Sequence, residues 1–105
     1  MQFTSFLEGK KLTIALTGEI DHHCAKVYIQ SIAAKIEAYT PEVCILDFRD
    51  VTFMDSSGIA VVINALRNMA QIEGKLVLSG IAPQPLRVFQ ASGIDKIVEI
   101  KEALV

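Results

Sequence analysis

The spacing of apolar residues changes several times along the chain, and each change marks a predicted element. Residues 2–8 and 11–18 are short segments joined by the polar sequence EGKK. In the second segment every other residue is large and apolar, namely Leu12, Ile14 and Leu16. A period of two is typical of a strand with one buried face. The chain is therefore predicted to open with a β-hairpin.

A helical period replaces the strand period at Asp21. Apolar residues then recur three or four positions apart up to about Tyr39, where Thr40 and Pro41 end the pattern. The recurring residues are Ala25, Ile29, Ile32, Ala33 and Ile36. This spacing predicts an amphipathic helix, and Asp21 is a suitable residue to cap its N-terminus.

Three short apolar runs in the rest of the chain are predicted to be strands. They are VCILDF at 43–48, KLVLSG at 75–80 and KIVEI at 96–100. The first run is almost entirely apolar, which is expected of an interior parallel strand buried on both faces.

Helical spacing separates these runs. One helix is predicted from residue 56 or 57 to about 72, closed by Gly74 just past its end. A shorter helix is predicted over 85–92 and is stopped by Gly93.

The order β-β-α-β-α-β-α-β predicts an α/β fold made of parallel βαβ units after the hairpin. No repeat, low-complexity tract or linker interrupts it, so residues 1–105 are predicted to form one domain. If each strand adds beside the previous one, the sheet is mostly parallel and four- to five-stranded. Right-handed crossovers then place the helices mainly on one face.

This topology predicts where a site lies. Loops that leave the carboxyl ends of parallel strands gather along one edge, where open α/β sheets usually bind ligands. The segments 18–22, 47–57 and 79–84 are therefore predicted to be neighbours.

The sequence FMDSSGI at 53–59 belongs to that edge and contains more polar groups than a helix cap needs. One Asp or Ser cap contributes about 1 kcal/mol. A glycine in a helix costs roughly 0.8 to 1.0 kcal/mol relative to alanine. From these residues alone, an ordinary cap and a functional site both remain open.

Composition excludes several kinds of partner. The formal charge of -2, from 10 basic and 12 acidic residues, favours neither nucleic acid nor an anionic membrane. No apolar run approaches the roughly 18 residues needed to span a bilayer, and the first residues lack the pattern of a signal peptide. The chain is predicted to be cytoplasmic, with Cys24 and Cys44 as reduced packing residues.

The motifs of common catalytic and metal sites are missing from the sequence. Ser57 could be imagined in a triad with His22 or His23 and Asp55, but MDSSG is not a G-x-S-x-G elbow. The triplet His22-His23-Cys24 has no second pair of ligands, and there is no phosphate-binding glycine motif. We therefore predict no catalytic residues, no metal and no cofactor. A serine that itself receives a phosphate fits the helix start better.

Three stretches together resemble a known family. They are LTGEIDHHCA, LDFRDVTFMDSSGIAVVINA and LSGIAPQPLRVFQASGIDKIVEI, in that order. They are similar to bacterial anti-sigma factor antagonists of the STAS type. The Asp-His-His after the second predicted strand is most similar to the sporulation branch, whose members act against anti-sigma-F factors.

The resemblance implies a switch protein without catalytic activity. Its unphosphorylated form would bind an anti-sigma factor that is also a serine kinase, and so free the sigma factor. Phosphorylation of the second serine of the motif, Ser57, would end the binding, and a PP2C-type phosphatase would reverse it. The implied partner-binding residues are Asp21, Asp55, Ser56, Ser57 and Gly58.

The sequence departs from the family pattern in two places. Either departure could change the affinity for a partner, but neither removes the serine that would accept the phosphate, Ser57. Cys24 stands where the sporulation proteins commonly have Thr, and Ile59-Ala60 where Leu-Gly is common. General-stress antagonists share the serine motif, so the sigma factor stays open. The alternative interpretation is a STAS module that binds a partner, a nucleotide or another ligand without being switched at Ser57.

Overall fold

The computed structural model describes residues 2–101. The strands are β1 (Gln2–Glu8), β2 (Lys11–Ile20), β3 (Val43–Met54), β4 (Lys75–Ser79) and β5 (Glu99–Lys101). The helices are α1 (His22–Tyr39), α2 (Ser57–Gln71) and α3 (Pro83–Ser92), followed by a 3-10 turn, η1 (Ile94–Lys96). The predicted order of elements is confirmed.

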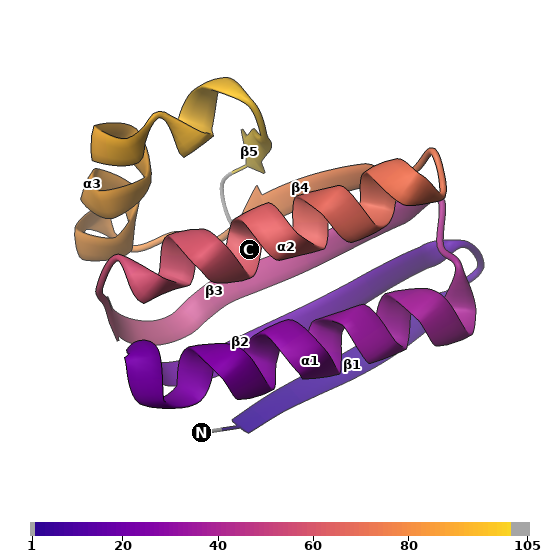
Figure 1. The fold of residues 1–105 in the computed structure, drawn as a ribbon, viewed down its shortest axis with the longest axis horizontal. Helices are drawn as coiled ribbons and strands as arrows, with labels where there is room; N and C mark the ends of the chain where they lie inside the picture. Colours follow the sequence, from indigo (N-terminus) through magenta and orange to yellow (C-terminus); the bar gives the residue numbers. More distant parts are fainter. Residues whose placement is uncertain (1, 102–105) are drawn as a thin grey trace.

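All five strands form one sheet in the order β1-β2-β3-β4-β5. β1 and β2 form the antiparallel hairpin, and each later strand adds in parallel beside the one before it. Figure 1 shows α1 and α2 side by side across one face of this sheet. The structure thus confirms a mostly parallel sheet with its helices on one face.

The two faces of the sheet differ because the side chains of each strand alternate. Leu12, Ile14 and Leu16 of β2 are fully buried beneath the helices. Thr13 and Ile45 are only partly buried on the opposite face, which no helix covers within the part of the chain that the structure describes. The hydrophobic core therefore lies between the sheet and the helices.

β3 is longer than the sequence pattern predicts. The predicted strand ends at residue 48, but β3 runs to Met54 because β2 also continues to Ile20 and supplies the hydrogen-bonding partner. The register of β3 against β2 shifts twice, and its buried residues, Phe48, Val51 and Met54, are three positions apart. This part of the strand therefore lacks the alternating pattern by which strands are predicted.

Two further boundaries differ from expectation. The predicted last strand at 96–100 is instead the turn η1 followed by β5 at 99–101. After α2 the left-handed residue is Glu73, with φ of 57°, rather than Gly74. Gly74 is needed for space, because a Cβ there would lie 2.5 Å from Cε of Met69.

Both cysteines are free and buried, as predicted. Burial raises the pKa of the Cys44 thiol to about 12. Cys44 is therefore protonated at neutral pH and acts as an apolar packing residue. No helix in residues 2–101 is long and apolar enough to cross a membrane.

Candidate functional site

The three segments predicted to share the carboxyl edge of the sheet do meet there. The N–H of Asp55 donates to the carbonyl oxygen of Ile20 at 3.1 Å, which joins the end of β3 to the end of β2. The side-chain amide of Gln84, from the start of α3, binds both main-chain groups of Met54, each at 2.9 Å. Asp21 and Asp55 therefore follow residues that are paired on neighbouring strands.

Asp21 caps α1, as the sequence predicts. Its Oδ1 accepts hydrogen bonds from the N–H groups of His23 at 2.9 Å and Cys24 at 3.2 Å. The N–H of Asp21 in turn donates to the sulfur of Cys24 at 3.4 Å. Cys24 thus takes the reciprocal place in a capping box, where Glu or Gln is usual.

The hydrogen bonds of this cap stabilise the negative charge of Asp21. Desolvation raises the pKa of the carboxyl group, but hydrogen bonds with Cys24 and His23, together with the charge of His23, outweigh it and leave the pKa below its ordinary value. The edge therefore carries a fixed negative charge at the start of α1.

Asp55 organises the start of α2. Its Oδ1 accepts the N–H of Ser57 at 2.7 Å, while Ser56, at the N-cap position, makes no capping hydrogen bond with its side chain. The side chain of Ser56 is exposed and that of Ser57 is half-buried. Asp55 therefore does the work of the cap and leaves both hydroxyls free of that task.

Gly58 lies where the helix start rests on the core. A Cβ at this position would lie 2.2 Å from Sδ and 2.3 Å from Cγ of Met54, whose side chain is fully buried. The absence of a side chain lets α2 approach the end of β3 closely.

The roles of two residues of this edge were missed by the sequence analysis. Gln84 ends the segment 79–84 that was predicted to lie at this edge, but its contact with Met54 was not predicted. Phe53 was part of the quoted motif but was not singled out. Its side chain is 43% exposed, although its neighbours Val51 and Met54 are buried. An exposed aromatic residue two positions before Asp55 is a typical contact for a protein partner.

This edge brings together acidic, hydroxyl and aromatic side chains. It presents the carboxylates of Asp21 and Asp55, the hydroxyls of Ser56 and Ser57, and the ring of Phe53. None of these five residues lines the hollow on the open face of the sheet. Within residues 2–101, no three His, Cys, Asp or Glu residues form a group that could hold a metal.

Comparison with known proteins gives the family. The sequence model of the STAS domain matches residues 7–105. The chain is 34% identical over 83 residues to an anti-sigma F factor antagonist of Lysinibacillus sphaericus, which covers 79% of this chain and 71% of that protein. It is 31% identical over 93 residues to an anti-sigma-B factor antagonist of Listeria monocytogenes, covering 86% and 78%.

Solved structures agree with this assignment. The anti-sigma factor antagonist SpoIIAA in its unphosphorylated form superposes with a TM-score of 0.85 at 28% identity, over 98% of this chain and 89% of that one. SpoIIAA of Bacillus in its phosphorylated form gives a TM-score of 0.76 at the same identity, over 98% and 92%. The chain belongs to the STAS domain family.

Proposed function

We propose that this chain is an anti-sigma factor antagonist controlled by phosphorylation of Ser57. The unphosphorylated form binds an anti-sigma factor that is also a serine kinase, and the sigma factor is released. The proposal is supported by the names of the relatives at 34% and 31% identity and by the likeness to SpoIIAA in both phosphorylation states. The chain acts in the cytoplasm as a binding partner and substrate, not as an enzyme.

The observation that carries the proposal is the place of Ser57. It is the first residue of α2, and its own N–H is held by Asp55, so the backbone around the hydroxyl is fixed. The kinase transfers the γ-phosphoryl group of ATP to Oγ, and ADP and a proton leave. A PP2C-type phosphatase hydrolyses the phosphate and restores the binding form.

The phosphate acts mainly by changing local charge. It adds about -1.5 to -2 charges, which gain roughly 0.3 to 1 kcal/mol at a helix N-terminus. At a separation of about 6 Å, this phosphate and the single negative charge of Asp55 repel each other by roughly 1 to 5 kcal/mol for a dielectric between 80 and 20. The N-terminus of α2 attracts the phosphate, whereas Asp55 repels it. Because these two effects partly offset each other, phosphorylation leaves the fold intact.

Loss of partner binding follows from where the charge is placed. The proposed interface contains Asp21, Asp55, Ser56, Ser57 and Gly58. A phosphate trapped there beside Asp55 and without a basic partner costs several kcal/mol, and each 1.4 kcal/mol is tenfold in affinity. Binding to the kinase is expected to weaken by a hundredfold or more.

The test is intact mass measurement after incubation with ATP and a candidate kinase. Anti-sigma-F and anti-sigma-B factors are both used, because relatives named for each match this chain. One added phosphate is expected, absent in Ser57→Ala and retained in Ser56→Ala as the matched control. Ser57→Asp is expected to weaken kinase binding while its circular dichroism stays unchanged. Equal kinase binding by the phosphorylated and unmodified chains contradicts the switch.

A further inference from the structure

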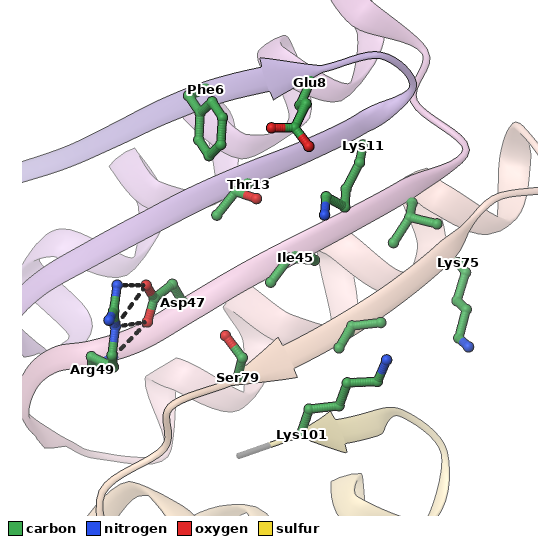
Figure 2. Close-up of a pocket in the computed structure, with 12 residues that line it drawn as sticks. Phe6, Glu8, Lys11, Thr13, Ile45, Asp47, Arg49, Lys75, Ser79 and Lys101 are labelled. Carbon is green, nitrogen blue, oxygen red and sulfur yellow. Dashed lines mark hydrogen bonds and ion pairs between the residues drawn. The ribbon is translucent and has the colours of Figure 1, made fainter. Parts of the chain in front are cut away.

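The open face of the sheet holds a hollow of about 580 Å³. Its lining comes only from strands, on the side away from α1 and α2 (Figure 2). Parallel sheets are usually covered on both faces, because an uncovered face leaves apolar side chains in water. This hollow is separate from the edge that carries Ser57, and it requires its own explanation.

Strand register arranges the lining into rows that cross the sheet. Phe6 is paired with Thr13, Thr13 with Ile45, and Ile45 with Val77, which gives one mainly apolar row over four strands. With neighbouring strands about 4.8 Å apart, this row is about 14 Å long. Phe6 at its outer end is 57% exposed, whereas Val77 is buried. We call these four residues the apolar row.

Basic side chains lie on both sides of the apolar row. Lys11 is in the next row on one side, and Lys101 is in the next row on the other. Figure 2 shows both extending over the hollow. The lining contains four basic residues, Lys11, Arg49, Lys75 and Lys101, and two acidic ones, Glu8 and Asp47.

These basic residues differ in whether they already form ion pairs. Arg49 forms an ion pair with Asp47 at 3.0 Å. Lys75 and Lys101 both contact the carboxylate of Glu99, which lies opposite Val77 at the end of the apolar row. Lys11 forms no ion pair with any residue in 2–101, although Glu8 is opposite it on β1. Lys11 is therefore the basic group available to a ligand.

We propose that the open face binds a small amphipathic carboxylate, of the kind represented by a medium-length fatty acid. The alkyl chain lies on the apolar row and covers the exposed ring of Phe6. The carboxylate is bound by Lys11, whereas Lys101 stays paired with Glu99. Glu99 shows that this face already accommodates a carboxylate between lysines.

The physical basis is the combination of apolar surface and unpaired charge. Burial of apolar area provides the driving force, at roughly 25 cal/mol per Å². An exposed ion pair alone contributes little, so an anion without an alkyl chain is not retained. An alkyl chain without the anion leaves Lys11 unpaired and is held more weakly.

The experiment measures binding of decanoate, below its micelle concentration, to the isotope-labelled chain by amide chemical shifts. Saturable shifts are expected at Thr13, Ile45 and Val77, without shifts along α2. Acetate is expected to give no saturable shifts, and decanol to bind about two- to fivefold more weakly than decanoate. No kinase is present, so the result does not depend on the function proposed for Ser57.

Variants locate the two halves of the ligand. Lys11→Gln is expected to weaken decanoate binding about two- to fivefold, whereas Lys26→Gln on the exposed side of α1 leaves it unchanged. Phe6→Ser, at an exposed position, is expected to weaken decanoate and decanol alike. Equal affinity for decanol and decanoate, shifts confined to the helices, or binding unchanged by Lys11→Gln overturns the proposal.

Discussion

Gly58 has no room for a side chain, and this makes it a sensitive position at the start of α2. A methyl group there would lie 2.2 Å from Sδ of the fully buried Met54. Overpacking of this kind costs about 1 to 3 kcal/mol, and the better helix propensity of alanine returns less than 1 kcal/mol. Gly58→Ala is expected to lower the free energy of unfolding by about 1 to 2 kcal/mol, measured by urea denaturation.

A double-mutant cycle shows whether Met54 is the cause. Met54→Ala removes the side chain that the new methyl group would meet. The double variant is therefore expected to lose less stability than the sum of the two single variants, by more than about 0.5 kcal/mol. Strict additivity contradicts the proposed clash.

Asp55 caps α2 with a side-chain oxygen, and its negative charge would repel the proposed phosphate on Ser57. Asp55→Asn keeps an oxygen that can accept the N–H of Ser57, whereas Asp55→Ala removes it. Asp55→Ala is expected to lose about 1 kcal/mol of stability and Asp55→Asn clearly less. Thermal unfolding of both variants measures the difference, and equal losses show that the 2.7 Å hydrogen bond is not the source of the effect.

The elements around the site are joined by an unusual contact between α3 and β3. β4 pairs with β3 only as far as Asp47, so the last residues of β3 have a strand on one side alone. Gln84 replaces the missing strand at Met54 by accepting its N–H and donating to its carbonyl oxygen. The start of α3 thus holds the residue directly before Asp55.

Removal of this contact is expected to loosen the loop between β3 and α2, which contains Asp55 and Ser56. Gln84→Ala leaves two partly buried main-chain groups unpaired, which costs about 1 to 3 kcal/mol. Gln84→Glu keeps the acceptor for the N–H of Met54 but loses the donor at neutral pH, so a comparable loss is expected. Hydrogen exchange of the Met54 amide is expected to speed up in Gln84→Ala and less in Gln84→Glu. Unchanged exchange in Gln84→Ala contradicts the role given to this contact.

Some of these elements could be predicted from the sequence and others could not. Helical spacing and the capping residue Asp21 are local signals, and they placed α1 and the edge correctly. The extension of β3 past Phe48 depends on a partner strand more than 25 residues earlier and on two register shifts, which no local pattern reveals. The neighbourhood of Gln84 was predicted, but its contact with Met54 was not, since that contact spans 30 residues.

At the scale of the whole molecule, the sheet has a face covered by helices, an open face, and an edge at the carboxyl ends of its parallel strands. The helices protect the core on one side, the loops at the carboxyl edge carry Ser57, and the open face carries Lys11 and the apolar row. Since Ser57 lies outside the core and its loop is tied to both β2 and α3, a charge added there changes the edge without repacking the helices. A switch of surface charge is the behaviour that this architecture favours.

The whole fold is also expected to lose stability in acid through two carboxyl groups. Hydrogen bonds from Lys75 and then Lys101 lower the pKa of Glu99, and the α1 cap holds the pKa of Asp21 below its ordinary value despite desolvation. A group whose pKa is lower in the folded state stabilises the fold above its unfolded pKa, and this stability is lost as pH falls through the folded value. The ordinary values are 3.8 for Asp21 and 4.5 for Glu99.

The free energy of unfolding is therefore expected to fall as the pH drops from about 5 towards 2, measured by urea denaturation at each pH. Asp21→Asn keeps an oxygen for the cap but cannot titrate, and Glu99→Gln cannot titrate between its lysines. The double variant is expected to be less stable at pH 7 and to show a flatter acid limb. Glu37→Gln, at an exposed position of α1, is the matched control and leaves the slope unchanged. An acid limb as steep in the double variant as in the parent chain shows that other carboxyl groups govern acid unfolding.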